Sequence, residues 1–154
     1  MKSEEIMPKI HKLPLPHDGE YTLIDESHSV GPESLKTAIR NLDDMKIDCQ
    51  PGSGRKIAII EIGDNSQEYN TQIGKLLAES SIDVVIGICP EVKDILSQLT
   101  PAQEQYYFED NTGLENFLAH ELLQDGDTIL IKGSQYGSGL RQTVERLIET
   151  VPEN

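Results

Sequence analysis

Charged and small polar residues follow two of the apolar runs in this sequence, and their types suit ligand binding. Asp25 and Glu26 end the run "YTLIDE", and His28 lies in the loop after it. Lys132 and Ser134 follow "TILI" in a glycine- and serine-rich stretch. A carboxylate in such a place can hold a ribose hydroxyl pair or, through water, Mg²⁺. The lysine can neutralise a carboxylate or phosphate, while loop amides bind an oxyanion.

Each of these segments also has a purely structural interpretation, which the pattern leaves open. Asp25 would then cap a turn and His28 would be a solvated loop residue. Lys132 would be a surface lysine on a flexible strand-to-helix connection. Because the lysine precedes the glycines, "KGSQYGSG" is not the phosphate-binding loop G-x-x-x-x-G-K-[ST], which occurs nowhere in the chain.

Acidic residues in "EIGDNSQE" raise the question of a metal site. Glu61, Asp64 and Glu68 are close in sequence, but nothing in the spacing fixes their mutual geometry. We therefore favour a helix cap followed by a solvated helix face, and we predict no metal site. Cys49 and Cys89 lack metal-ligand spacing and neighbouring histidines, so we interpret them as reduced thiols rather than nucleophiles.

Apolar runs alternate with amphipathic stretches along most of the chain. The predicted strands are 21–25, 56–62, 83–89, 105–109 and 126–133, and the predicted helices are 32–45, 65–79, 91–99, 110–123 and 139–151. This alternation predicts an α/β fold, a Rossmann-like three-layer αβα domain with a mainly parallel sheet. Residues 1–20 contain three prolines and are predicted to be an extended lead-in, with one α/β domain over 21–154.

Charge and hydropathy exclude several classes of partner. The 154 residues carry a formal net charge of −14, which opposes binding to a nucleic-acid backbone, so we expect no nucleic-acid partner. No apolar run approaches the roughly 18 residues of a membrane span. The first 20 residues lack the hydrophobic segment of a secretory signal, so we expect a cytoplasmic protein without a membrane span.

Three stretches resemble the C-terminal domain of the Mur ligases, with the MurF type as the nearest match. "TLIDESHSVGPESLKTAI" resembles the family's strand, D-[DE]-S-Y-N-A-N-P loop and helix, matched at Asp25, Glu26, Ser27 and Pro32. "GRKIAIIEIGDNSQEYNTQIGKLL" resembles the family's next strand and helix. "GDTILIKGSQYGSGLRQTVERL" resembles its closing GD-x-[VI]-L-[VI]-K-G-S-(R/N). Together the likeness covers residues 10–151.

The sequence departs from these motifs at several positions. His28, Ser29 and Gly31 stand where the family usually has Tyr, Asn and Asn, and Gln135 replaces a common Arg. The G-D-M portion of the middle motif is missing. These departures bear mainly on the first loop, because two asparagines that the family usually carries there are absent.

The resemblance implies a role for each matched loop. The nucleotide contacts would be Asp25, His28 and Ser29. The contacts to substrate or phosphate would be Lys132, Gly133 and Ser134. It implies no catalytic residue and no metal ligand in this domain.

The resemblance also implies a function that needs other domains. The chain would be the amino-substrate-binding domain of a MurF-type ATP-dependent amide ligase of peptidoglycan precursor synthesis, with a D-alanyl-D-alanine-like substrate. Partners would be ATPase and UDP-sugar-binding domains in the same or another chain. ATP and Mg²⁺ would act only in that complete ligase, with none tightly bound to this chain, which we expect to be inactive alone.

Two other interpretations remain open at this stage. The chain could be a stand-alone, diverged module that binds a nucleotide or a protein partner without catalysis, or a generic Rossmann-like domain. All ligand-binding interpretations share one geometric prediction. The turns after the first and last parallel strands must converge, so that Asp25 and Lys132 border a common cleft.

Overall fold

A six-stranded sheet forms the centre of the computed structural model, which describes residues 9–16, 18–26, 32–45, 54–61, 67–132 and 140–149. The strands are β1 (Lys9–Pro14), β2 (Glu20–Asp25), β3 (Lys56–Glu61), β4 (Val84–Ile88), β5 (Glu104–Phe108) and β6 (Thr128–Lys132). Their order is β1-β2-β6-β3-β4-β5. Only β1 is antiparallel to its neighbour among these strands, which confirms the predicted α/β fold with a mainly parallel sheet.

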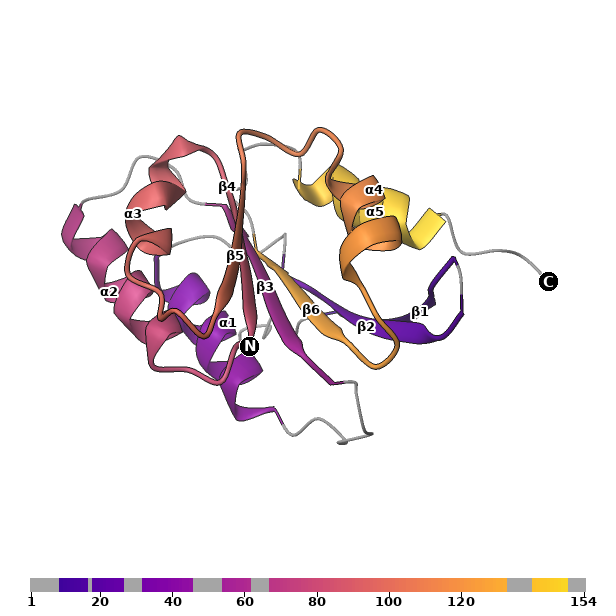
Figure 1. The fold of residues 1–154 in the computed structure, drawn as a ribbon, viewed down its shortest axis with the longest axis horizontal. Coiled ribbons are helices and arrows are strands. Elements are labelled where there is room, and N and C mark those ends of the chain that lie inside the picture. The colour runs from indigo at the N-terminus through magenta and orange to yellow at the C-terminus, as the bar shows by residue number, and fades with distance from the viewer. Residues whose placement is uncertain are drawn as a thin grey trace, which may run out of the picture.

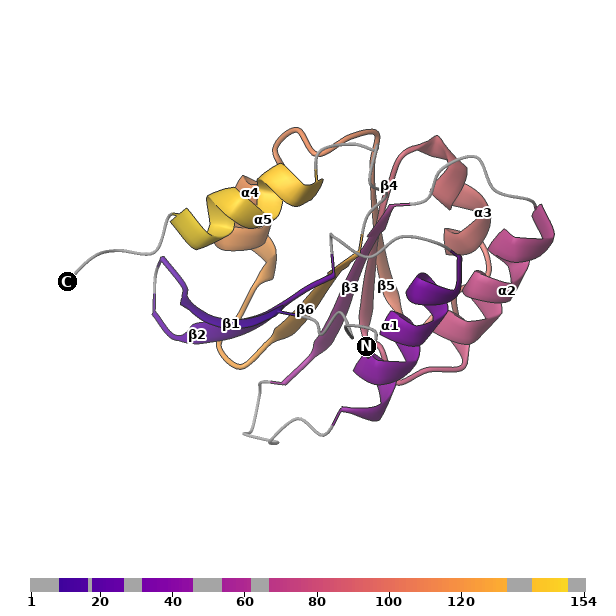
Figure 2. The ribbon, with the colours of Figure 1, turned by 180° about the vertical axis from the view of Figure 1, so that it is seen from behind.

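Helices cover both faces of the sheet, giving three layers (Figure 1, and from behind in Figure 2). One face carries α1 (Pro32–Asp44), α2 (Gln67–Ala78), the 3₁₀ turn η1 (Pro90–Val92) and α3 (Lys93–Leu96). The other carries α4 (Leu114–Phe117), the π-helical turn η2 (Leu118–Leu122) and α5 (Leu140–Glu149). Within these described residues, no helix is long and apolar enough to cross a membrane.

The central strands are buried on both faces, which explains their almost continuous apolar sequences. Every residue of β3, β4 and β6 is buried. In β3, Ile57 and Ile59 pack toward α4 and α5, whereas Ala58 and Ile60 pack toward α1 and α2. Burying each such isoleucine contributes roughly 1.5–3 kcal/mol relative to leaving it exposed, so these strands anchor both helical layers.

The predicted extended lead-in contains an edge strand of the sheet. β1 pairs with β2 from Lys9 opposite Asp25 to Pro14 opposite Glu20. The side chain of Leu13, on β1, packs into the core on the α4/α5 face. Lysine and proline on an edge strand discourage pairing with a further strand. The same residues made this segment look like a linker in the sequence, but they suit a strand at the edge of the sheet.

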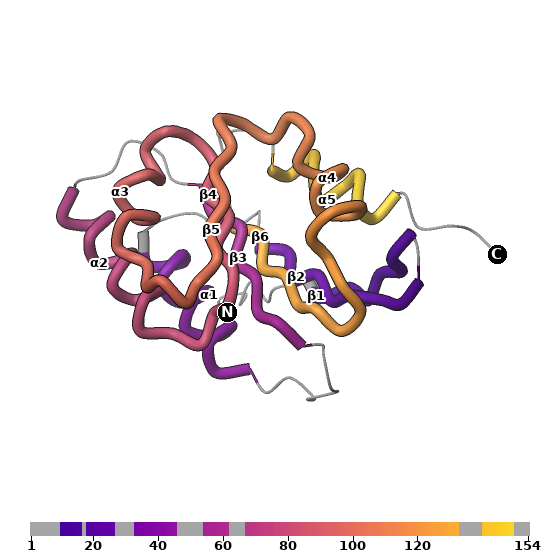
Figure 3. Tube along the Cα trace, in the orientation of Figure 1, coloured from indigo at the N-terminus to yellow at the C-terminus, as the bar shows by residue number. Residues whose placement is uncertain are grey.

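The last strand lies in the middle of the sheet. β6 runs between β2 and β3, so segments far apart in sequence are side by side (Figure 3). The chain leaves β2 and β3 toward α1 and α2 on one face, but leaves β6 toward α5 on the other. At the carboxyl ends of the strands, the chain therefore turns to one face after β2 and β3 and to the opposite face after β6, which lies between them. In open α/β sheets, ligands bind at such a topological switch point.

Two predicted helices are shorter and less regular than the sequence suggested. The predicted helix 91–99 is η1 followed by the four residues of α3. The predicted helix 110–123 begins only at Leu114, because Asp110 Oδ1 accepts a hydrogen bond from Thr112 N (2.8 Å) and makes a turn of the preceding residues. That helix then widens into the π-helical turn η2.

Candidate functional site

The carboxyl ends of β2, β6 and β3 bring the predicted strand-end residues together. We call the edge formed by Asp25, Glu26, Glu61 and Lys132 the carboxyl rim. Asp25 lies opposite Ile131, and Lys132 lies opposite Ile60. Glu26 N donates a hydrogen bond to the carbonyl oxygen of Ile131 (2.9 Å). The first and last parallel strands therefore end side by side, as the sequence analysis required.

Register places Asp25 and Lys132 on different faces of the sheet at this rim. Side chains alternate along a strand, and Leu23 packs toward α4 and α5, so Asp25 follows it to that face. Leu130 packs toward α1 and α2, and Lys132 follows it there. The two groups share the rim rather than one face, so a ligand must lie across the rim to contact both.

Lys132 is a buried ammonium group near two carboxylates. Its residue is 4% exposed. Burial lowers the pKa of Lys132, while the nearby charges of Glu26 and Glu61 act in the opposite direction without cancelling the effect. Burial therefore disfavours the charged form, and an additional anion at the rim would favour it again. This is the electrostatic setting in which a lysine binds a phosphate or carboxylate.

Glu61 is a buried acid at the carboxyl end of β3. It is 5% exposed at the end of β3, and its Oε2 accepts a hydrogen bond from Cys89 Sγ at 3.3 Å. Glu61 is therefore the last residue of β3, inside the strand predicted at 56–62, and not part of a helix cap or a solvated helix face. Glu68 is exposed on α2, as predicted, and Asp64 lies outside the described residues.

Cys89 directly follows β4 and carries a protonated thiol. Burial, followed by the hydrogen bond to Glu61 and the charge of Glu61, raises its pKa to about 12. A thiol held in this form is a poor nucleophile, which agrees with the sequence interpretation. Its backbone φ of 79° is in the left-handed region, which costs a non-glycine residue roughly 1–3 kcal/mol.

Several predicted residues cannot be placed at the rim. His28, Ser29, Gly133 and Ser134 lie outside the described residues, as does Cys49, so their roles remain predictions. Within the described ranges, no cluster of three or more histidine, cysteine or acidic side chains could hold a metal ion.

Sequence reasoning missed Glu61 as a neighbour of Lys132. Its signal was present, because Glu61 directly follows the apolar run "KIAII" at the carboxyl end of a predicted strand. The missing information was the strand order, since β6 lies beside β3 only after the chain has passed through β4 and β5.

No protein-family model matches this sequence. Among solved structures, it is similar to a MurF ligase of Thermotoga maritima in complex with ADP, with a TM-score of 0.60 and 19% identity over 96% of this chain. It is also similar to the UDP-N-acetylmuramoylalanyl-D-glutamyl-2,6-diaminopimelate–D-alanyl-D-alanyl ligase of Acinetobacter baumannii, with a TM-score of 0.66 and 16% identity over 97% of this chain.

A third similar structure is a single domain, described as part of a UDP-N-acetylmuramate:L-alanyl-γ-D-glutamyl-diaminopimelate ligase from Haemophilus ducreyi. The TM-score is 0.55 and the identity 21%, over 86% of this chain and 92% of that domain. By contrast, this chain spans 31% and 30% of the two complete ligase chains above. The fold is therefore that of a Mur ligase domain, which confirms the fold expected from the sequence resemblance.

Proposed function

We propose that this chain is the C-terminal, amino-substrate-binding domain of a MurF-type ATP-dependent amide ligase. The observation that carries the proposal is the position of Lys132, a buried ammonium group at the topological switch point of a Mur ligase fold. In the proposed ligase, ATPase and UDP-sugar-binding domains come from the same or another chain. The amino substrate is a D-alanyl-D-alanine-like dipeptide.

The path of β1 supports a carboxyl rim that faces those other domains. Because β1 is antiparallel to β2, its first residue, Lys9, lies opposite Asp25. In a ligase whose ATPase domain precedes this one, the connection would arrive at that same rim. Ligand groups held by the ATPase domain would then meet Asp25 and Lys132 without a long crossing of the sheet.

The proposed chemistry assigns this domain positioning and charge stabilisation. ATP and Mg²⁺, bound in the complete ligase, supply the phosphoryl group that activates a carboxylate. Lys132 would stabilise negative charge on phosphate or on the incoming carboxylate, with Gly133 and Ser134 beside it in sequence. Asp25 would accept hydrogen bonds from ribose hydroxyls, with His28 and Ser29 in the same loop. Such contacts accelerate a reaction by holding reactants in place.

Calorimetric titration of the chain with ADP in the presence of Mg²⁺, and separately with D-alanyl-D-alanine, tests the proposal. We expect Lys132→Ala to weaken binding of the anionic ligand at least about tenfold, since a charge-assisted hydrogen bond is lost, while the domain stays folded. Asp25→Ala should weaken ADP binding alone. Lys93→Ala is the matched control, because Lys93 is exposed and lies over the Tyr107 ring (4.8 Å to its centroid).

An unchanged dissociation constant for Lys132→Ala would refute the assigned role. A second function, a diverged module without catalysis, is favoured by the departures at Ser29, Gly31 and Gln135 from the Mur ligase motifs. Absence of heat with ADP, ATP and D-alanyl-D-alanine, together with a protein partner recovered by pull-down, would support that second function instead.

A further inference from the structure

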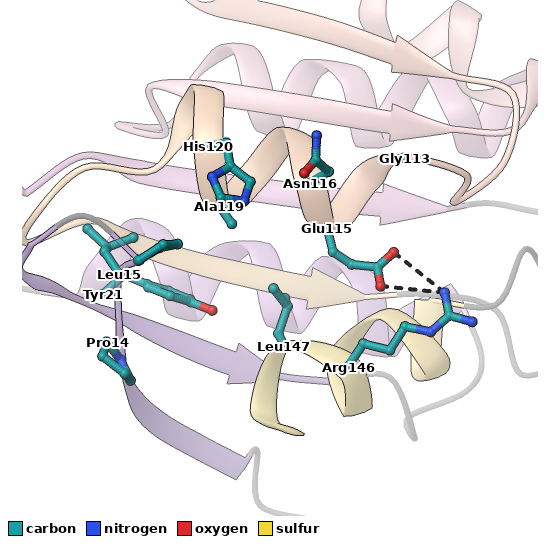
Figure 4. A pocket seen from close by; sticks show the side chains of 11 residues that line it. Pro14, Leu15, Tyr21, Gly113, Glu115, Asn116, Ala119, His120, Arg146 and Leu147 are labelled. Carbon is teal, nitrogen blue, oxygen red and sulfur yellow. Dashed lines mark hydrogen bonds and ion pairs between the residues drawn. The ribbon is translucent and has the colours of Figure 1, made fainter. Parts of the chain in front are cut away.

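A pocket of about 600 Å³ opens on the α4/α5 face of the sheet. Its walls are the turn between β1 and β2, the helical segment formed by α4 and η2, and the end of α5 (Figure 4). The volume is in the range of small-molecule sites. None of the four residues of the carboxyl rim lines it, so it is a separate feature of the molecule.

Hydrogen bonds hold the turn that forms one wall. Leu15 N donates to the carbonyl oxygen of Gly19 (2.8 Å), and Glu20 N donates to Asp125 Oδ1 (3.0 Å). The carbonyl oxygen of Glu20 in turn accepts from Gly126 N (2.9 Å). These bonds join the described residues on the two sides of the turn and fix Glu20 to Asp125 and Gly126, so this wall of the pocket is preformed.

Tyr21 brings a hydroxyl group to the pocket. The residue is 4% exposed, and Figure 4 shows the hydroxyl directed along the floor toward Leu147. Within the described part of the chain, no group hydrogen-bonds to it. Burial raises the pKa of Tyr21 to about 12, so the hydroxyl is a neutral donor. The hydroxyl borders the pocket, so a ligand there can accept a hydrogen bond from it.

The charges at the edge of the pocket favour an uncharged ligand. Arg146 Nη1 pairs with Glu115 Oε2 at 3.4 Å, so positive and negative charge already offset each other there. An anionic ligand would meet the Glu115 carboxylate and the net charge of −14. The other surfaces include the apolar side chains of Leu15, Ala119 and Leu147.

The wall opposite the β1–β2 turn has an unusual backbone. Ala119 belongs to the π-helical turn η2, and such turns within α-helices occur frequently at functional sites. The small side chain of Ala119 also leaves room beside the pocket. Both features suit a cavity that admits a ligand.

We propose that this pocket binds an uncharged small molecule with a compact apolar body and a carbonyl oxygen that accepts a hydrogen bond from the Tyr21 hydroxyl. The apolar body lies against Leu15 and Leu147. The proposal does not depend on the ligase assignment, because it uses a different face of the domain.

Amide chemical shifts of the full chain, titrated with benzamide, test this proposal. We expect a millimolar dissociation constant and shift changes confined to α4, η2, the end of α5, Tyr21 and the β1–β2 turn. Tyr21→Phe keeps the ring and removes the donor, so it should weaken binding about three- to tenfold. Tyr106→Phe is the matched control, because that hydroxyl donates to Glu104 Oε2 (2.7 Å) on β5, and it should leave binding unchanged.

Two further comparisons make the test decisive. Benzoate has nearly the same shape as benzamide but carries a negative charge, and it should bind more weakly. Ala119→Leu should block the pocket and abolish the shift changes. The proposal is overturned if benzoate binds as tightly as benzamide, if Tyr21→Phe binds benzamide as the unmodified chain does, or if the shift changes lie elsewhere.

Discussion

The two rims of the sheet differ in the surroundings of their charged residues. At the amino rim, where the parallel strands begin, Arg55 pairs with the fully buried Asp127 (Nη2 to Oδ2, 2.6 Å). At the carboxyl rim, burial instead lowers the pKa of Lys132 despite two nearby carboxylates. The Arg55–Asp127 pair shows that the amino rim stabilises the fold, whereas we propose that the carboxyl rim serves a ligand.

Lys56, at the amino rim, has hydrogen-bond partners for both its side chain and its backbone N–H. Its Nζ donates to the carbonyl oxygen of Asp43 (2.6 Å) and to Ser81 Oγ (2.9 Å). Its backbone N donates to Asp83 Oδ2 (2.9 Å). These bonds connect α1 with the starts of β3 and β4, so the amino rim is a structural network with defined partners.

The largest predicted effect is at Asp127. Its carboxylate accepts two hydrogen bonds from Arg55 and one from Gln124 N (2.9 Å). Asp127→Ala should lower the free energy of unfolding by about 3 kcal/mol, measured by urea denaturation, since it leaves these donors without their acceptor. Asp125→Ala is the control, because exposed Asp125 accepts a single bond from Glu20 N and should lose only about 1 kcal/mol. Equal losses would contradict the assigned difference.

The same substitution at both rims sharpens the comparison. Lys56→Met should lower the free energy of unfolding by about 2 kcal/mol, because two hydrogen bonds are lost. Lys132→Met should lower it by less than Lys56→Met does, because burial already disfavours the charged ammonium group and methionine removes that desolvation cost. Paired denaturation curves measure both values. A larger loss at Lys132 than at Lys56 would reverse the assignment of the two rims.

A smaller, pH-dependent effect is expected at Asp43. Hydrogen bonds from the backbone and side chain of Ser81 lower the pKa of Asp43 below its ordinary value. The carboxylate therefore contributes stability above the unfolded-state pKa, about 4, and loses it as the pH falls through the folded-state pKa. Asp43→Asn should lower the free energy of unfolding by up to about 1 kcal/mol at pH 7, with a smaller difference in acid. A difference that grows as the pH falls would contradict this.

The smallest expected effect is on the reactivity of the Cys89 thiol, which lies beside Glu61 of the carboxyl rim. In a Cys49→Ser background, Cys89 should react slowly with iodoacetamide at pH 8.5, since its pKa is raised to about 12. Glu61→Gln removes the neighbouring negative charge, so it should lower that pKa and speed alkylation several-fold. Glu68→Gln is the control, because Glu68 is exposed on α2. Equal rates in all three proteins would show that Glu61 does not control the thiol.

The sequence predicted the parallel strands well because burial on both faces requires continuous apolar runs such as "KIAII". It did not predict β1 as a strand, because Pro14 and the lysines of an edge strand resemble a linker. The sequence identified the carboxyl ends of strands as candidate sites. Which side chains lie close together there depends on the order of the strands and on the face to which each side chain points. Lys132 shares its surroundings with Glu61 only because the last strand lies beside β3.

The pocket was beyond sequence reasoning for a similar reason. Its walls come from segments around Tyr21, Ala119 and Leu147, which are far apart along the chain. Tyr21 shares one face of β2 with Leu23 and therefore looks like an ordinary core residue in the sequence. Only the packing of α4, η2 and α5 against the β1–β2 turn reveals that its hydroxyl meets a cavity.

The most direct measurement of ligand binding at the carboxyl rim is an NMR titration of the full chain with ADP and Mg²⁺. The amides of Asp25, Glu61 and Lys132 should shift, those of Lys56 and Asp127 should not, and Lys132→Ala should remove the response. Shifts concentrated at the amino rim, or no shifts at either rim, would contradict the central claim that charge at the carboxyl rim serves a ligand.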